Sequence, residues 1–297
     1  MKQQLDNKKR LKKPNGGSSL EIREMQSSDI DFALSLTEEE GWSSIRSDFE
    51  ELRLFDQHGC FIVEEDGISI GMACALSYGP FGTLGNLILV REYRGRGYGT
   101  KLMEHGMEYL KNKGVGFTML DAVPKAVPLY ERLGFRKVCR SLRLRGRVEP
   151  VVSARVRALE DKDMLKVLSI DREQFGANRF LFLGSTLSAN PNLGRLLEVD
   201  GQIAGFLLGS RRRGFVRLAP WVMCSHFELA KSILKDFAVQ VGGAEIRTGV
   251  LETSRKAIAA LKESGLYQES FSWRMVHGKD RIEFSDGLFA IGSPMRG

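Results

Sequence analysis

The chain repeats one pattern of apolar runs and turns along its length, and this repeat constrains the fold more than any single motif. Residues 22–36 and 156–170 each have the pattern of a strand, a polar cap and an amphipathic helix. The turn signal Asp66-Gly67 recurs farther along the chain at Asp200-Gly201. An Asp-Gly pair between two apolar runs is typical of a two-residue β-hairpin. The sequence therefore predicts two copies of one arrangement of strands and helices.

A third correspondence extends the repeat toward the end of each copy. The helical run that closes at Gly134 recurs before Gly265, with nearly the same separation along the chain as the other matched segments. Glycine at these positions suits the left-handed residue that ends a helix. We predict a first domain over residues 20–148 and a second over 151–297, after a basic tail over 1–19 that we expect to be disordered.

A glycine-rich turn joins an apolar strand to a helix within residues 87–102. Its glycines are Gly95, Gly97 and Gly99, and two arginines flank them, Arg94 and Arg96. Glycine lets backbone N–H groups approach a ligand, and a helix N-terminus favours negative charge, so the turn predicts a phosphate-binding loop. The loop lacks the Lys-Ser/Thr pair of nucleoside-triphosphate loops, and Thr100 stands where a dinucleotide fingerprint needs glycine. An ordinary glycine-rich turn with basic flanks is the alternative.

The order Arg94-x-x-Gly97-x-Gly99 on this strand and helix resembles the acyl-CoA-binding loop of the GNAT N-acetyltransferase superfamily. The resemblance implies that acetyl-CoA is the acyl donor and that backbone amides of the loop hold its pyrophosphate. It also implies that backbone groups of Leu89 bind the pantetheine arm as an added strand would. The loop residues that we expect to bind CoA are Arg94, Gly95, Arg96, Gly97, Tyr98, Gly99 and Thr100.

The run from Ala126 to Phe135 resembles the second signature of the same superfamily. A tyrosine of that signature lies near the thioester sulfur, so the resemblance makes Tyr130 the candidate general acid that protonates the departing thiolate. A core tyrosine with a hydrogen-bonded hydroxyl is the alternative. The sequence departs from the family at Val123, where an asparagine is common, so a CoA-positioning amide is missing or comes from elsewhere.

The second copy lacks both signatures. Its fourth strand is expected over residues 215–223, and a capped helix is predicted to begin at Ser225 without an Arg-x-x-Gly-x-Gly run. Leu261 stands where the first copy has Tyr130, and leucine has no proton to donate. We therefore predict a catalytically degenerate GNAT-like domain, as in two-domain GNAT proteins with a divergent C-terminal domain. This domain either completes the acceptor pocket or forms a purely structural interface.

The resemblance implies an α+β fold of three layers, with tandem GNAT folds that each contain a mixed, mostly antiparallel sheet flanked by helices. CoA would enter a splay between the fourth and fifth strands, and the acceptor would approach from the opposite side. The implied enzyme is an N-acetyltransferase that moves an acetyl group to a primary amine of a small molecule or peptide by direct attack. An acyl-CoA-binding sensor without turnover is the alternative, and the fold does not identify the acceptor.

No residue stands out as the base that must deprotonate the attacking amine. The candidates are Glu40 and Asp121, and a solvated carboxylate or a helix cap is the alternative for each. Two aromatic residues are candidates either for the wall of the acceptor pocket or for the core, Trp42 and Tyr78. The second domain offers three further candidates for the pocket, Asp171, Asn178 and Arg179.

Composition limits the remaining classes of function. Part of the net charge of +7 lies in the tail, which has no interleaved aromatic residues, so we do not expect a nucleic-acid partner. The four cysteines and four histidines lack ligand spacing, so we expect no metal. No apolar stretch is as long as a membrane span, which favours a cytoplasmic protein without membrane contact. The sequence leaves open whether the protein forms a homo-oligomer.

Overall fold

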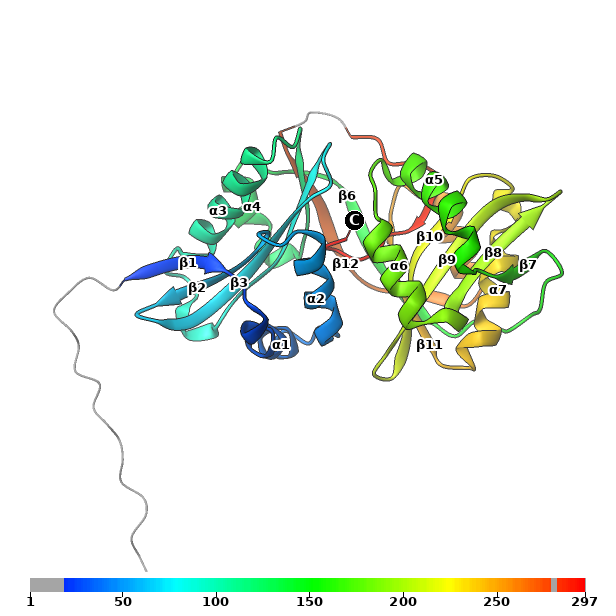
Figure 1. Cartoon of the computed structure of the whole chain (residues 1–297), viewed down its shortest axis with the longest axis horizontal. Coiled ribbons are helices and arrows are strands. Elements are labelled where there is room, and N and C mark those ends of the chain that lie inside the picture. Colours follow the sequence, from blue (N-terminus) through cyan, green and yellow to red (C-terminus); the bar gives the residue numbers. More distant parts are fainter. Residues whose placement is uncertain (1–18, 279–281, 297) are drawn as a thin grey trace, which may run out of the picture.

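The computed structural model describes residues 19–278 and 282–296. The tail predicted over residues 1–19 therefore lies outside the described residues, except for Ser19. The described chain forms two similar halves that share one continuous sheet, with helices on both of its faces (Figure 1). This architecture confirms the predicted mixed sheet flanked by helices.

The first half follows the predicted repeat unit. Asp66 and Gly67 have φ angles of 53° and 75°, the left-handed values that a two-residue hairpin turn requires. The elements of this half are β1 (Leu20–Glu24), α1 (Ile30–Glu39), α2 (Arg46–Phe55), β2 (Cys60–Glu65), β3 (Ile68–Ser77), β4 (Gly82–Leu89), α3 (Tyr98–Asn112), β5 (Thr118–Ala122), α4 (Val127–Arg132) and β6 (Arg136–Gly146).

The second half repeats this order and adds one short strand. Its hairpin turn at Asp200 and Gly201 has φ angles of 50° and 74°, nearly those of the first half. The elements are β7 (Val156–Ala158), α5 (Met164–Phe175), α6 (Phe180–Ala189), β8 (Gly194–Val199), β9 (Gln202–Arg212), β10 (Phe215–Met223), α7 (Ala230–Val241), β11 (Glu245–Leu251), α8 (Arg255–Glu263), β12 (Leu266–His277) and β13 (Leu288–Ala290).

The start of α7 corrects one prediction. A helix was expected from Ser225, but α7 begins at Ala230, after a 3-10 turn over Phe227–Leu229. His226 precedes that turn in the left-handed region with a φ of 49°. Because a left-handed residue cannot be part of a right-handed helix, no helix can run from Ser225 through His226.

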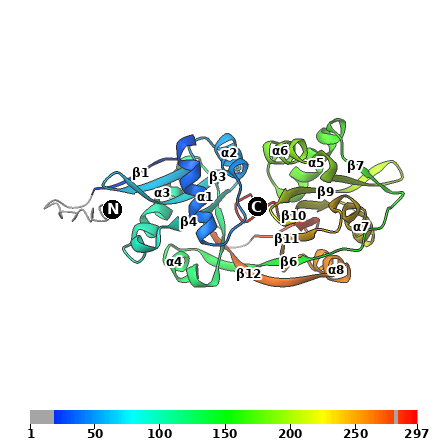
Figure 2. The same cartoon turned by 90° about the horizontal axis from the view of Figure 1, so that it is seen from below.

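The two halves exchange their last long strands. The order at the centre of the sheet is β5-β12-β6-β11, so β12 of the second half lies between β5 and β6 of the first. Figure 2 shows β6 and β12 running together across the middle of the molecule. Ser141 pairs directly with Ser272, and these two serines stand at equivalent places after Gly134 and Gly265. The strand exchange therefore relates the halves by an approximate two-fold axis through this pair.

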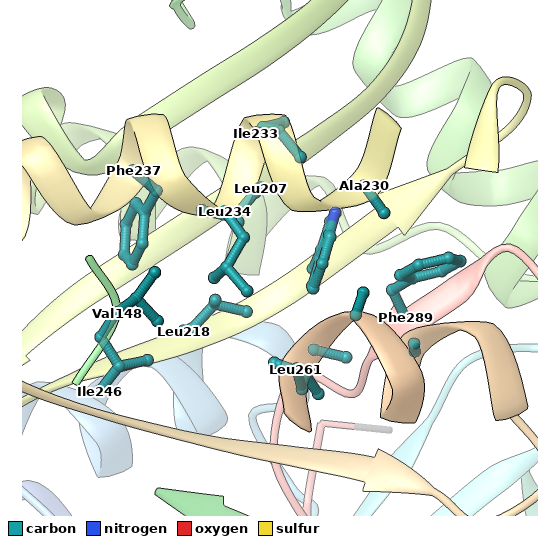
Figure 3. Packing of buried hydrophobic residues seen from close by; sticks show 14 of the residues in the cluster. Val148, Leu207, Leu218, Ala230, Ile233, Leu234, Phe237, Ile246, Leu261 and Phe289 are labelled. Carbon is teal, nitrogen blue, oxygen red and sulfur yellow. The ribbon is translucent and has the colours of Figure 1, made fainter. Parts of the chain in front are cut away.

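Apolar residues fill the space between the sheet and each helix layer. In the first half, α1 and α2 cover one face and α3 and α4 cover the other. In the second half, Leu234 of α7 points toward Leu218 of β10 and Phe237 of α7 toward Val148 and Ile246, while Phe289 of β13 lies at the other end of the same cluster (Figure 3). Burying a side chain of this size contributes roughly 1.5–3 kcal/mol to stability, so both cores favour one fixed arrangement of layers.

A search of the helices in the described ranges finds none that is both long enough and apolar enough to cross a lipid bilayer.

Candidate active site

The parallel strands β4 and β5 separate shortly after they begin. They pair only at Gly82 with Thr118 and at Thr83 with Met119. Farther along β4, the pairing with β3 shifts between Met72 and Cys74, and Asn86 has a φ of 51°. Two residues of β4 therefore lie opposite one residue of β3, which is a β-bulge. The bulge bends β4 away from β5, so the two strands diverge. Met295 packs against this part of β4: its carbonyl accepts a hydrogen bond from the hydroxyl of Thr83 at 2.8 Å, and its side chain lies beside Gly85.

The glycine-rich turn forms the N-terminus of α3 and follows the diverging end of β4. Gly95 and Gly97 have left-handed φ angles of 77° and 83°, and a Cβ atom at either would meet nothing within 4 Å. In the described part of the chain, the backbone N–H groups of Gly97, Gly99 and Thr100 have no hydrogen-bond acceptor. Unpaired N–H groups at a helix N-terminus attract anions. The turn can therefore bind an anion such as a phosphate.

Arg94 and Glu40 come from distant parts of the chain and meet beside this turn. The Nη2 atom of Arg94 lies 2.7 Å from Oε1 of Glu40, and Nζ of Lys125 lies 3.4 Å from Oε2 of the same carboxylate. Burial opposes ionisation of Glu40, but Arg94 and Lys125 outweigh it and lower the pKa of the carboxyl. Arg94 Nε also donates to the carbonyl of Leu89 at 2.8 Å. Leu89, Arg94 and Glu40 thus form one polar group beside the loop.

The other charged residue of the loop faces a second carboxylate. Arg96 lies 3.7 Å from Glu65 of β2 and stacks on the ring of Tyr93, and the phenol of Tyr98 also bonds to Glu65. The Arg96 side chain is about half exposed, so a phosphate can compete with Glu65 for it at low energetic cost.

Tyr130 lies on α4, on the face of the sheet that α3 covers. It is 8% exposed, and burial raises the pKa of its phenol to about 12. Among the described residues, no group forms a hydrogen bond with this hydroxyl. Gly134 ends the helix with a φ of 84°, as predicted. The phenol therefore keeps its proton at neutral pH and remains free to donate it.

Asp121 is placed differently from Glu40. Its side chain is 1% exposed and forms ion pairs with Arg274 at 2.5 Å and with Arg143 at 3.0 Å. Burial opposes its ionisation, but the two arginines prevail and hold the pKa of this carboxyl below its ordinary value. A carboxylate that is sealed and stabilised in this way is a poor proton acceptor, so the geometry favours a structural role.

Three residues predicted for the acceptor pocket lie together, but inside the interface between the halves. The carboxylate of Asp171 pairs with Arg179 at 2.5 Å, and each side chain is 1% exposed. Tyr78 packs against Phe175 of the second half and donates its hydroxyl proton to the carbonyl of Arg296 at 3.1 Å. Their burial places these side chains in the interface rather than on a surface that an acceptor can reach.

Trp42 and Asn178 are accessible. Trp42 is 40% exposed and lies in the 40–45 loop, by which we mean the segment between α1 and α2. Asn178 accepts a hydrogen bond from the backbone N–H of Phe180 at 2.8 Å, which holds the start of α6. Trp42 therefore stays a candidate pocket residue, whereas Asn178 has a local structural partner.

The corresponding space in the second half is filled by the chain itself. Strands β10 and β11 pair only from Phe215 to Arg217 and then diverge. Strand β13 enters the gap, where it pairs with β10 at Trp221 and Val222. The backbone N–H of Ile291, just after β13, bonds to the carbonyl of Gly249 in β11. A peptide strand thus satisfies backbone groups on both sides of the gap.

Two features of this region were missed from the sequence. The bulge at Asn86 has only a weak signal, a glycine followed by asparagine inside an apolar strand. Arg217 is the single charge within the otherwise apolar run 215–223, and that signal is visible in the sequence.

Among the residues that the structure describes, no group of three or more His, Cys, Asp or Glu side chains is arranged to hold a metal ion.

Comparisons with known protein families match both halves. A model described as the acetyltransferase (GNAT) family matches residues 27–135, and one described as an acetyltransferase (GNAT) domain matches residues 167–290. A curated relative, N-alpha-acetyltransferase 30 of Schizosaccharomyces pombe, is 39% identical over 66 residues. That match covers 21% of this chain and 42% of the relative, so less than half of the relative is represented.

Solved structures match the whole fold. A provisionally assigned acetyltransferase from Pyrococcus horikoshii superposes with a TM-score of 0.79 at 24% identity, over 94% of this chain and 96% of that one. A GCN5-related N-acetyltransferase from Sphaerobacter thermophilus has a TM-score of 0.66 at 18% identity, over 89% and 98%. At these identities the likeness shows the fold, in which both halves and their arrangement are shared.

Proposed function

The chain belongs to the GNAT acetyltransferase family, and from this premise we propose that its first half transfers an acetyl group from acetyl-CoA to a primary amine. The observation that carries the proposal is the set of N–H groups at the N-terminus of α3 that have no acceptor among the described residues, beside two strands that diverge. The amine acceptor also agrees with the name of the curated relative, an N-alpha-acetyltransferase.

The loop supplies the binding energy for the donor. The amides of Gly97, Gly99 and Thr100 face outward with the positive end of the α3 dipole behind them. Arg94 and Arg96 add two full charges, and each exchanges a carboxylate partner for a phosphate oxygen when the donor binds. The free edge of β4 beyond Thr83 offers backbone groups to the pantetheine arm as a neighbouring strand would.

The chemical step needs one proton removed and one supplied. The thioester provides the acetyl group; the neutral amine attacks its carbonyl carbon, the new C–N bond forms and the C–S bond breaks. Tyr130 donates its phenolic proton to the thiolate, and its pKa of about 12 keeps that proton in place until charge develops on sulfur. Solvent then returns a proton to the phenolate.

Glu40 is the better candidate for the base. Its carboxylate lies beside the loop and is 18% exposed, whereas the carboxylate of Asp121 is sealed between two arginines. When phosphate oxygens take over Arg94, the carboxylate of Glu40 loses a stabilising partner and its pKa rises toward the ordinary value. A more basic Glu40 then accepts the amine proton, directly or through water.

We propose that the second half binds no acetyl-CoA. Strand β13 occupies the gap that the pantetheine arm would use, and Phe289 packs against Trp221 and Phe227. Leu261 replaces the tyrosine and is fully buried. The second half contributes instead to the surface beside the 40–45 loop, through Arg217, whose Nη2 atom donates to Ser43 at 3.1 Å.

Calorimetric titration of the full chain with acetyl-CoA tests this function first. We expect one site per chain, followed by acetylation of amines that is at least about 100-fold slower in Tyr130→Phe with unchanged donor affinity. Tyr267→Phe, an exposed tyrosine bonded to Arg145, is the matched control and should behave as the parent chain does. Donor binding without transfer to any amine favours the acyl-CoA sensor; two sites per chain contradict the assignment of the second half.

A further inference from the structure

Five arginines from both halves gather where the 40–45 loop meets the second half. They outnumber the carboxylates that contact them, which are Asp48 and Glu51 of α2 and Asp121 of β5. The cluster therefore has two more positive than negative charges, and the nearby Asp171–Arg179 pair adds none. We call this group the interface arginine cluster; its members are Arg143, Arg212, Arg217, Arg274 and Arg296.

Four members of the cluster have carboxylate partners. Arg212 and Arg296 contact Asp48 at 2.9 Å and 3.0 Å, and Arg296 also contacts Glu51 at 2.7 Å. The other two pair with the same carboxylate of β5, which is Asp121. These pairs explain most of the buried charge without any ligand.

Arg217 is the exception. Within the described residues it forms no ion pair, and its one hydrogen bond is from Nη2 to the hydroxyl of Ser43. Its side chain is partly exposed, and none of its nitrogen atoms is both sealed from solvent and without a partner. Burial and the charge of Arg212 lower the pKa of Arg217 to about 10, and the negative charge of Asp48 opposes this shift only in part. The guanidinium is still charged at neutral pH, and an anion beside it would relieve its desolvation.

The 40–45 loop links Arg217 to the donor loop. Ser43, the partner of Arg217, is three residues from Glu40, which contacts Arg94, and three residues span at most about 11 Å. The positive charge of Arg143 also lowers the pKa of Arg217. Arg143 itself pairs with Asp121 of β5. The exposed Trp42 adjoins Ser43 in the same loop.

A glycine leaves room for the Arg143 guanidinium, which donates to Asp121 and to Ser272. A Cβ atom at Gly249 of β11 would lie 3.2 Å from Nη1 of Arg143. Because β11 separates β6 from β10 in the sheet, any larger side chain at this position would crowd the Arg143 guanidinium. The guanidinium groups of Arg143 and Arg217 are thus held on the side of the sheet that the 40–45 loop covers. In the described part of the chain, Arg143 has a carboxylate partner and Arg217 has none.

We propose that Arg217, with Arg143 beside it, binds a carboxylate of the acceptor, so that the substrate is an amine that also carries a carboxylate. The inference rests on the proposed acetyl transfer and names its substrate class. A planar carboxylate accepts two parallel hydrogen bonds from a guanidinium, which fixes its orientation as well as its position. The carboxylate belongs either to a free amino acid or to an acidic residue of a peptide, and the experiment separates the two.

Kinetics of the full chain with saturating acetyl-CoA form the first arm. Free amino acids are compared with their amides, and peptides that begin with Asp-Ala are compared with peptides that begin with Asn-Ala. We expect kcat/KM to be at least about tenfold higher for the charged member of one pair. Arg217→Gln should bring that ratio to about one, mainly through KM, and Arg217→Lys should keep part of it. Equal rates within both pairs in the parent chain, or a preference that survives Arg217→Gln, would overturn the proposal.

Arg213→Gln is the matched control. Arg213 is exposed in the turn between β9 and β10, so its replacement removes the same charge a short distance along the chain from Arg217. The control should keep the preference for the carboxylate. Since Arg217 has no ion pair to lose, Arg217→Gln should melt within a few degrees of the parent chain.

Binding without turnover forms the second arm. Succinate and its uncharged analogue succinamide are titrated into the full chain, and tryptophan fluorescence, to which Trp42 contributes, is followed. We expect succinate to bind, succinamide not to bind, and Arg217→Gln to weaken succinate at least about tenfold. Absence of succinate binding, or binding that Arg217→Gln leaves unchanged, contradicts the proposal even if amines are acetylated. Succinate binding through Arg217 in a chain that acetylates no amine supports the carboxylate site and contradicts the proposed function instead.

Discussion

The two halves share a scaffold and differ in what fills the gap between their fourth and fifth strands. In the second half β13 lies in the gap and bonds to both neighbouring strands. In the first half β4 and β5 separate beyond Thr83, and a bulge at Asn86 bends β4 away from β5. Diverging strands leave backbone groups without partners, so either the chain or a ligand must satisfy them. We read the first half as a binding site and the second as the same site closed by its own chain.

The halves also show which features were retained. Arg23 pairs with Asp29 and Glu64 in the first half, and the equivalent Arg157 pairs with Asp163 and Glu198 in the second. These ion pairs hold β1 and β7 to the hairpins beside them, and all three members of each set stand at equivalent places in the repeat. Structural interactions are thus duplicated, whereas the glycine loop and the tyrosine occur in the first half alone.

The largest expected effect is on the strand that fills the second gap. Phe289→Ala removes a fully buried ring from the space between α7, α8 and β10, so unfolding should become easier by about 3–5 kcal/mol. Chemical denaturation measures the loss, and Phe180→Ala, at a ring that is 51% exposed, is the control. If both variants are equally stable, β13 is not an integral part of the second half and the comparison fails.

The next prediction compares acetyl-CoA affinity after a change at the N-terminus of α3 and after one at the N-terminus of α7. Gly97 and His226 are both left-handed residues ahead of the helix that follows the fourth strand. Gly97→Glu places a side chain in a strained left-handed conformation and a negative charge beside the phosphate, so acetyl-CoA affinity should fall at least about 100-fold. His226→Glu should leave affinity unchanged, because we place no donor there. Calorimetry on both variants decides; an equal loss in the two would break the distinction between the halves.

A smaller effect tests the duplicated ion pairs. Hydrogen bonds from Arg23 and Arg157 lower the pKa of Asp29 and of Asp163 below the ordinary value of about 4, which remains that of the unfolded chain. Protons therefore bind the unfolded chain first as pH falls, so each pair stabilises the fold above about pH 4 and ceases to do so as pH drops through the folded pKa.

Asp29→Asn and Asp163→Asn should each lower stability by about 1–2 kcal/mol at pH 7, and the difference from the parent chain should shrink toward pH 3. Melting temperatures across this range measure it. Similar losses in the two variants sharpen the comparison; a loss that is independent of pH would show that the ion pair is not its source.

The smallest effect concerns Glu40. Removing its carboxylate frees Arg94 for phosphate, so Glu40→Gln should tighten acetyl-CoA binding by up to about fivefold, the value of an exposed ion pair. Glu39→Gln, an exposed neighbour in α1, is the control. Weaker donor binding in Glu40→Gln would mean that the carboxylate orients Arg94 instead of competing for it.

Local signals in the sequence were sufficient for the turns and the loop. Asp66-Gly67 and Gly134 adopt the left-handed angles that the predicted hairpin turn and helix end require, because each depends on the conformational freedom of one or two residues. The roles of Tyr130 and the CoA loop stay predictions, and so does the domain division at residues 148–151, since β6 and β12 are exchanged across it.

The sequence by itself determined the family, the duplication and the loss of the signatures in the second half, because these are written in short runs of neighbouring residues. Only the tertiary structure decided that β12 crosses into the first half, that β13 closes the second gap and that Arg217 forms no ion pair with a carboxylate of residues 19–278 or 282–296. These facts depend on contacts between residues far apart in the chain, and hydrophobic patterning does not specify which distant strand or carboxylate will be the partner.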